Sequence, residues 1–144
     1  MLMNITIAAA LMVATTAIHA GGMVLALTAL RVQGHSTRHR LKHTRVYWIC
    51  GIILLMFIVS LVEVLVWALT YLALNAIDGL EKALYFSMVT FTTLGYGEIV
   101  LDERWRLLAS FEAGNGIIMF GWTTAIVIAS VQRIYLSKEP KIGR

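Results

Sequence analysis

The sequence predicts an all-α membrane protein with three membrane-spanning helices and a fourth, half-length helix that enters the membrane and returns. Three observations lead to this fold class. The 144 residues are 59% hydrophobic and only 14% charged, and their mean hydropathy of +0.79 is far above that of a soluble domain. Three stretches almost free of charge are each long enough to cross about 30 Å of hydrocarbon. A shorter apolar segment runs into the sequence TTLGYG, which has no helical periodicity.

The first predicted helix covers residues 4–30, within an amino-terminal segment 1–32 that carries no charge before position 31. The segment has no basic residue at its start, and its apolar run exceeds the hydrophobic region of a signal peptide. We therefore expect it to be retained as a membrane helix. The basic link that follows, residues 33–45, ends at the second predicted helix.

The second predicted helix covers residues 46–76, in which Glu63 is the one charged residue before position 76. A short helix is expected over residues 80–92, where Asp78 and Glu81 have the spacing of a capping box. Its length of about 20 Å is too short to cross a bilayer. The third spanning helix, residues 105–135, contains Glu112 in an otherwise apolar run and leaves a short tail, 136–144.

The distribution of basic residues predicts the orientation, because Lys and Arg beside short loops stay cytoplasmic. The run RVQGHSTRHRLKHTR carries five of them, the tail RIYLSKEPKIGR carries four, and residues 76–106 carry three. We expect the amino terminus outside, and the link and the carboxyl terminus in the cytoplasm. The basic surplus indicates contact with anionic lipid head groups at the link and no binding of nucleic acid.

The half-length helix and the irregular stretch after it predict a re-entrant loop. Lipid cannot satisfy the amides and carbonyls of an extended chain at membrane depth, so protein must shield them and they must line water or ions. Three long helices from one chain cannot surround such a loop on every side. The sequence therefore predicts an assembly of several copies.

The stretch Thr92-Thr93-Leu94-Gly95-Tyr96-Gly97-Glu98, preceded by ALYFS, resembles the pore helix and selectivity filter of the potassium-channel family. The resemblance extends over residues 46–132, the pore domain, and implies a small bacterial-type channel with one extra amino-terminal helix. It further implies a homotetramer in a bacterial inner (plasma) membrane that conducts K⁺ passively. No cofactor is expected besides K⁺ ions in the filter.

Carbonyl oxygens replace the hydration shell of K⁺ in such filters, and the resemblance places the filter at residues 93–97. The expected ion ligands are Thr93, Leu94, Gly95 and Tyr96, with Gly97 completing the filter. Gly95 and Gly97 permit φ > 0, which a residue with a Cβ resists. Thr92 and Val89 are expected to support the filter from the short helix.

The inner helix contains residues that recur at helical spacing and that the resemblance places on the cavity below the filter. They are Ile117, Phe120, Thr124 and Ile128. Gly116 lies at or beside the position of the family's inner-helix hinge, with Gly114 and Gly121 as alternatives. A glycine that lets two helices approach closely is the competing interpretation.

Three positions near the filter depart from the commonest pattern of the family. Glu98 replaces an aspartate, the proline that often follows a few residues later is absent, and Val89 stands where some bacterial channels have a buried glutamate. We expect Glu112 to compensate by bracing the short helix through Thr90 or a neighbouring hydroxyl, or to form a plain interhelical hydrogen bond. Glu63 and His19 fall at similar depth, and we expect them to pair and tie the extra helix to the pore domain.

Alternatives to a potassium channel are a weakly selective cation channel, a non-conducting membrane subunit and an ion-coupled transporter core. The transporter interpretation is disfavoured because such cores carry four pore loops in one chain, and this sequence has one. An enzyme is not expected, since the sequence has no nucleophile beside a base and no phosphate-binding loop. A voltage sensor is not expected either, since no helix carries arginines at every third position.

Overall fold

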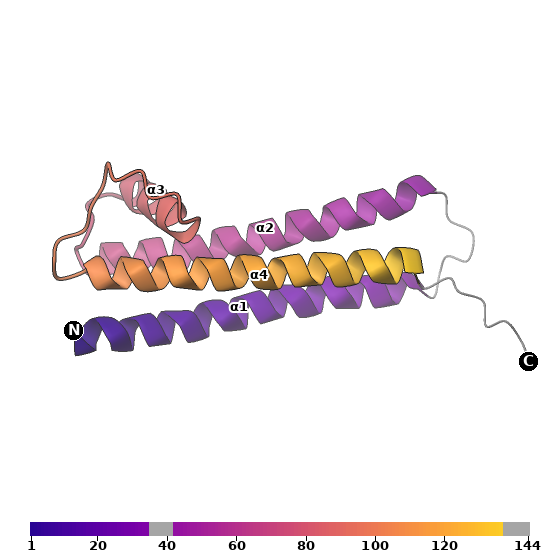
Figure 1. Cartoon of the computed structure of the whole chain (residues 1–144), viewed down its shortest axis with the longest axis horizontal. Helices are drawn as coiled ribbons and strands as arrows, with labels where there is room; N and C mark the ends of the chain where they lie inside the picture. The colour runs from indigo at the N-terminus through magenta and orange to yellow at the C-terminus, as the bar shows by residue number, and fades with distance from the viewer. Residues whose placement is uncertain (35–41, 137–144) are drawn as a thin grey trace, which may run out of the picture.

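The computed structural model describes residues 1–34 and 42–136, and in this part of the chain it contains four helices. They are α1 (Leu2–Gly34), α2 (Lys42–Ala73), α3 (Leu80–Phe91) and α4 (Arg106–Leu136). The three long helices lie side by side, and the short α3 lies at the end of the bundle where the chain begins (Figure 1). The three long helices are apolar enough over sufficient length to span a membrane, which confirms the predicted all-α membrane fold.

Helix α3 packs against α2 and α4, whereas α1 contacts α2 and α4 on a different side and does not touch α3. The main hydrophobic core lies at the α3 end and includes Trp67, Tyr71, Phe91 and Leu108, all fully buried. A smaller core around Met56 joins α2 to α1 and α4 farther along the bundle. The extra helix α1 therefore widens the bundle without covering the short helix.

The turn after α2 ends the helix earlier than the sequence predicted, at Ala73 rather than residue 76. Asn75 has φ 51°, a left-handed conformation that asparagine tolerates better than most residues. The Ala76 amide donates to the Tyr71 carbonyl at 2.9 Å, and the Asn75 amide donates to the Leu72 carbonyl at 3.0 Å. This pair of bonds is a Schellman motif, which satisfies the last carbonyls of α2.

The start of α3 differs from the predicted capping box. Gly79 is the N-cap, with φ 92° and ψ 135°, and no side chain caps the helix. Asp78 therefore lies one residue before the cap, and the predicted bond from its carboxylate to the first amides is wrong. The helix then runs for 12 residues, about 18 Å at 1.5 Å per residue, close to the predicted half-length.

The helices beside the basic link are longer than predicted, because α1 continues to Gly34 and α2 already begins at Lys42. Lys, Arg and Leu are good helix formers, so a spanning helix can continue beyond the hydrocarbon. Residues 35–41, the centre of the link for which lipid contact was predicted, lie outside the described residues, as do residues 137–144.

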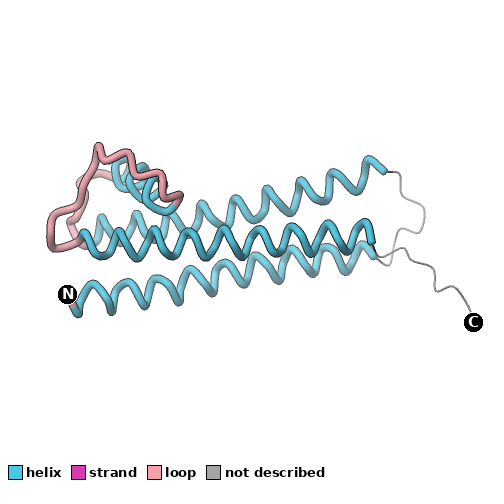
Figure 2. The backbone as a smooth tube through the Cα atoms, viewed as in Figure 1, coloured by secondary structure: helices cyan, strands magenta, loops and turns pink. Residues whose placement is uncertain are grey.

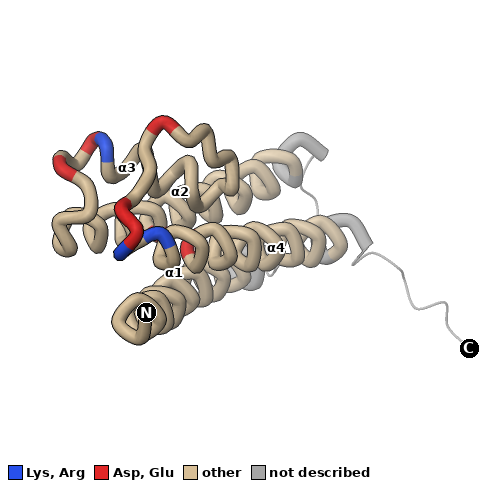
Figure 3. Tube along the Cα trace, turned by 60° about the vertical axis from the view of Figure 1, so that its left-hand side comes forward, with Lys and Arg blue, Asp and Glu red and all other residues tan. Residues whose placement is uncertain are grey.

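Most of the charged residues that Figure 3 colours lie at the α3 end of the bundle. Within the spans, Glu63 and Glu112 are the exceptions, and both are fully buried. Exposed apolar side chains such as Leu54, Phe57 and Leu65 cover the outer face of α2. This distribution suits a bundle whose middle lies in lipid and whose α3 end meets water.

Candidate functional site

The segment that follows α3 turns back tightly against the end of that helix (Figure 2). The amides of Leu94 and Gly95 both donate to the Val89 carbonyl, at 2.9 and 3.3 Å. Thr92 is the C-cap of α3, and its hydroxyl donates to the Met88 carbonyl at 2.7 Å. These bonds occupy carbonyls that the last turn of a helix leaves open. Val89 and Thr92 thus hold the start of the predicted filter segment, Val89 through its backbone.

Positive φ angles recur at every second residue of this segment. Thr93 has φ 59°, Gly95 has φ 59° and Gly97 has φ 84°, whereas Leu94 and Tyr96 have negative φ. The glycines adopt this region without steric cost. Thr93 is β-branched, and holding it there costs about 1–3 kcal/mol. Strain of this kind concentrates at functional sites, which makes the segment the leading candidate.

A recess of about 110 Å³ lies between α3 and the returning segment, lined by Tyr85, Val89, Tyr96 and Glu98 among others. The Tyr85 hydroxyl donates to Glu98 Oε2 at 2.6 Å. This hydrogen bond to a carboxylate is the main cause that raises the pKa of Tyr85. Glu98 therefore connects the far end of the segment to α3, across the recess.

Glu112 on α4 lies beneath α3 with both carboxyl oxygens in hydrogen bonds. The Tyr71 hydroxyl donates to Oε2 at 2.7 Å, and Ser87 Oγ lies 2.5 Å from Oε1. Ser87 Oγ also lies 2.9 Å from the Val64 carbonyl. The predicted hydrogen bond between Glu112 and a hydroxyl of the short helix is present, and that hydroxyl is Ser87, a neighbour of Thr90. Together these residues, the Glu112 cluster, join α2, α3 and α4.

One turn farther along α4, Gly116 packs directly against the backbone of Phe91. A Cβ at Gly116 would overlap the Phe91 carbonyl, whereas a Cβ at Gly114 or Gly121 would have no neighbouring atom within 4 Å. Small residues allow this closeness between membrane helices. The close approach supports the packing interpretation of Gly116.

The residues predicted to line a cavity occupy the outer surface of α4. Ile117, Phe120 and Ile128 are 62%, 39% and 52% exposed, and Thr124 is exposed as well. The Phe120 ring also meets the Phe91 ring edge-on, with centroids 5.7 Å apart. This face of α4 is therefore open in the single chain and continues from the end of α3.

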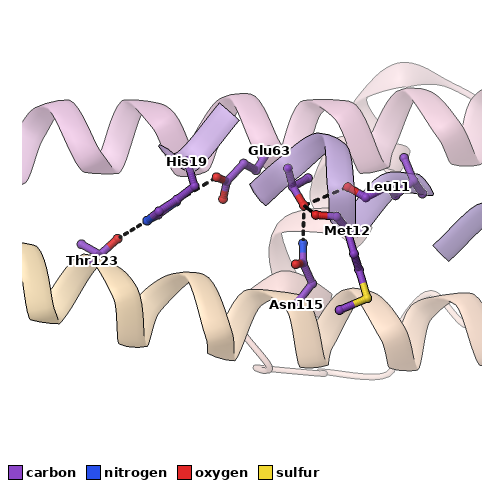
Figure 4. A network of polar contacts seen from close by, with 7 residues as sticks. Leu11, Met12, His19, Glu63, Asn115 and Thr123 are labelled. Carbon is purple, nitrogen blue, oxygen red and sulfur yellow. Dashed lines mark hydrogen bonds and ion pairs between the residues drawn. The ribbon is translucent and has the colours of Figure 1, made fainter. Parts of the chain in front are cut away.

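A second buried polar cluster connects α1 to the other helices (Figure 4). His19 Nδ1 lies 2.8 Å from Glu63 Oε1 on α2, with both side chains fully buried. His19 Nε2 lies 3.2 Å from Thr123 Oγ1 on α4, and its ring lies 5.3 Å from that of Trp122. The predicted pair of His19 and Glu63 is confirmed, and these residues form the His19 cluster.

Two further polar contacts fasten α1 to α4 and to the loop before it. Asn115 Nδ2 donates to Thr15 Oγ1 at 2.9 Å, and Asn4 Nδ2 donates to the Arg104 carbonyl at 2.6 Å. Oδ1 of Asn115 and Oε2 of Glu63 have no hydrogen-bond partner among the described residues. The attachment of α1 is thus extensive but leaves buried oxygens unsatisfied.

The partners Tyr71, Ser87 and Tyr85 were not singled out from the sequence. Each is a hydroxyl on a helix that otherwise presents mostly apolar side chains, which is the one signal that could have indicated them. That signal does not identify the hydrogen-bond partner of each hydroxyl, because the partner depends on how each helix is rotated about its axis.

Comparison with family models gives a match to the model described as "Ion channel" over residues 53–133, more than half of the chain. The match extends from α2 through α3 to α4 and includes the candidate segment. It leaves α1 outside. Comparisons with curated proteins and with solved structures give no match.

Proposed function

The chain belongs to the ion-channel family, and we propose that it conducts potassium ions selectively and passively through a homotetrameric pore. Membership of the family makes the protein an ion channel rather than an enzyme. The finer properties, potassium as the ion and four copies as the assembly, are supported by the geometry of residues 93–97. In this proposal, K⁺ is the ion conducted, and no other cofactor takes part.

The observation that carries the proposal is the alternating sign of φ at Thr93, Gly95 and Gly97. In an ordinary extended chain, successive carbonyls point to opposite sides. Reversing φ at every second residue turns them toward one side, and four such segments around an axis supply rings of oxygen atoms. Rings of backbone carbonyls are the ligands that replace the hydration shell of K⁺. The carbonyls of residues 93–96 are the proposed ligands.

Helix α3 strengthens such a site, because its carboxyl end adjoins the segment through the bonds to Val89. The end of a helix carries a partial negative charge of about half an elementary charge. A cation near the first residues of the segment would be stabilised by this charge, the more so when four helices surround it. The short helix thus has an electrostatic role as well as a supporting one.

The incomplete enclosure of the segment in one chain supports an assembly of several copies, and the resemblance to potassium-channel filters puts their number at four. Leu94 and Tyr96 are 55% and 64% exposed, and lipid cannot satisfy the backbone beside them. The open face of α4, with Ile117 and Ile128, continues the same surface. Copies arranged around this surface would cover the apolar side chains and leave the carbonyls facing the axis. The amino terminus and α3 would lie outside the cell, opposite the basic link.

The proposal is tested by ion flux from liposomes that contain the purified protein. We expect K⁺ efflux that barium blocks and that is much slower when Na⁺ replaces K⁺. Gly95→Ala should reduce the K⁺ flux at least about tenfold, because a Cβ at positive φ costs roughly 1–2 kcal/mol in each chain. Gly51→Ala is the matched control, since the added Cβ meets open space at both glycines and only Gly95 has positive φ. Equal Na⁺ flux would indicate a weakly selective channel, and absence of flux a non-conducting subunit.

A further inference from the structure

The hydroxyl of Ser87 is close to two oxygens that ordinarily both accept hydrogen bonds. It lies 2.9 Å from the Val64 carbonyl and 2.5 Å from Glu112 Oε1. A serine hydroxyl has one hydrogen to donate. If Glu112 were ionised, Ser87 could satisfy only one of the two, and the other contact would bring two acceptors together without a proton between them.

A proton on Glu112 removes this conflict. Oε1–H then donates to Ser87 Oγ, the Ser87 hydroxyl donates to the Val64 carbonyl, and the Tyr71 hydroxyl donates to Oε2. In this arrangement the carboxyl hydrogen of Glu112 and the hydroxyl hydrogens of Ser87 and Tyr71 each have an acceptor.

The surroundings of Glu112 also disfavour a charge. The side chain is fully buried, and among the described residues no basic group lies within ion-pair distance of it. The titratable group that faces it is Tyr71, from α2, while α3 contributes the uncharged Ser87. An unpaired carboxylate in such a place would cost several kcal/mol. The neutral acid avoids this cost.

We propose that Glu112 is held as a neutral carboxylic acid and that in this form it positions α3 beneath the filter. Ser87 and Phe91 are four residues apart on α3, and their partners Glu112 and Gly116 are four apart on α4. Residues four apart lie on one face of a helix. The acid and the glycine therefore fix both the depth and the rotation of α3. The positioning role rests on the proposed function, whereas the protonation state does not.

Infrared spectroscopy of the full-length protein in liposomes tests the protonation state directly. At about pH 7, where an ordinary glutamate is ionised, the spectrum of the wild type minus that of Glu112→Gln should contain the carbonyl stretch of a protonated carboxylic acid. A carboxylate band in its place would overturn the proposal. Glu98→Gln is the matched control and should remove a carboxylate band, since this exposed group accepts from Tyr85.

Selective flux tests the positioning role. Glutamine keeps a donor for Ser87 and an acceptor for Tyr71, so Glu112→Gln should retain the K⁺ over Na⁺ preference within about threefold, whereas Glu112→Leu should lower it about tenfold or more. If Glu112→Leu does not fold, adding Tyr71→Phe removes the stranded hydroxyl, and the double variant replaces it. Equal selectivity of the Gln and Leu variants would overturn the positioning role.

The pH profile tests whether Glu112 keeps one protonation state over the working range, and the infrared spectrum tells which state that is. From about pH 5 to about pH 7, wild type and Glu112→Gln should show flux profiles of the same shape, because the acid stays protonated throughout this range in which free glutamate is charged. A step in the wild type that Glu112→Gln lacks would overturn the proposal. If the wild type conducts no K⁺ at all, the proposed function fails, and the infrared result still decides the protonation state.

Discussion

Two buried glutamates join the helices of this channel, and they are satisfied to different degrees. Both oxygens of Glu112 have hydrogen-bond partners, on α2 and α3. Glu63 uses one oxygen for His19 on α1, and its Oε2 has no partner in the described part of the chain. The complete cluster lies under the short helix that carries the candidate filter, and the incomplete one holds the extra helix.

The difference separates a fixed region from an adaptable one. A fully connected polar network in a dry interior is rigid and specifies one arrangement, while a partly satisfied network has alternatives close in free energy. In the proposed pore the filter segment needs a fixed position, because rings of carbonyls cannot coordinate an ion if the strands shift. Helix α1 lies outside the matched family region, and the cluster that attaches it leaves one oxygen of Glu63 without a partner among the described residues.

The largest expected effect comes from breaking the fixed region at Gly116. Replacing it with alanine places a methyl group against the Phe91 backbone, which cannot yield as a side chain can. We expect a loss of about 3 kcal/mol or more in the free energy of unfolding, the upper end for overpacking. Thermal unfolding in detergent measures it. Gly114→Ala and Gly121→Ala have open space at the added Cβ and should unfold at or above the wild-type temperature. Equal behaviour of all three would exclude the packing role of Gly116.

The next largest effect is expected from substitutions in the His19 cluster, which test whether His19 and Glu63 are coupled. His19→Leu removes the one hydrogen-bond partner that Glu63 has among the described residues and should destabilise the fold by about 1–3 kcal/mol, the cost of leaving a buried polar group unsatisfied. Adding Glu63→Leu should recover at least about 1 kcal/mol of that loss, measured again by thermal unfolding. Additive losses would contradict a coupled pair. Thr28→Val is the control, because that exposed hydroxyl bonds only within α1.

The two clusters also show how far sequence reasoning reached. Glu63, Glu112 and His19 stood out because each interrupts an apolar span, and a buried polar group requires a partner. Counting about 1.5 Å per residue from the basic link was enough to pair His19 with Glu63, since both lie on long helices that adjoin that link. The three spans and the half-length helix were predictable for the same reason, that lipid imposes length and composition.

The sequence could not predict the features that depend on how a helix is rotated about its axis or on the geometry of local turns. The partner of Glu112 was expected at Thr90 or a neighbouring hydroxyl, and it is Ser87. The sequence could not choose between the two, because they lie within one turn of the short helix. Asn75 and Gly79 set the ends of α2 and α3 through positive φ, and no cap was needed from Asp78. The roles of residues 93–97 as ion ligands remain predictions that the flux experiments test.

A smaller effect is expected from Tyr71→Phe, which removes one hydroxyl and keeps the ring. The ring continues to pack edge-on against Phe86, with centroids 5.2 Å apart, so the loss is that of a buried hydrogen bond, about 1–2 kcal/mol. Thermal unfolding of this variant is compared with Tyr47→Phe, a 75% exposed tyrosine whose change should stay within about 0.5 kcal/mol. A loss no greater than that of the control would show that Glu112 does not need Tyr71, and the contrast between the clusters would weaken.

The smallest effect is expected at the edge of the fixed region, where Tyr85 is exposed and bonds Glu98. The bond holds the proton on Tyr85 and raises its pKa, so the folded protein keeps this phenol neutral to higher pH than the unfolded chain does. The contribution of this hydrogen bond to the stability of the fold is therefore present at neutral pH. It is lost only as the pH rises through the raised pKa of Tyr85, above the usual value of about 10.

An absorbance titration of tyrosinate in the folded protein measures this shift. Subtracting the curve of Tyr85→Phe from that of the wild type should isolate a step above the ordinary tyrosine range, and Glu98→Gln should move that step down toward it. The thermal unfolding temperature should hardly change in either variant. If Tyr85 titrated at the ordinary pKa of tyrosine, its hydrogen bond to Glu98 would not be formed in solution. The link between the segment and α3 across the recess would then depend on neighbouring copies of the chain.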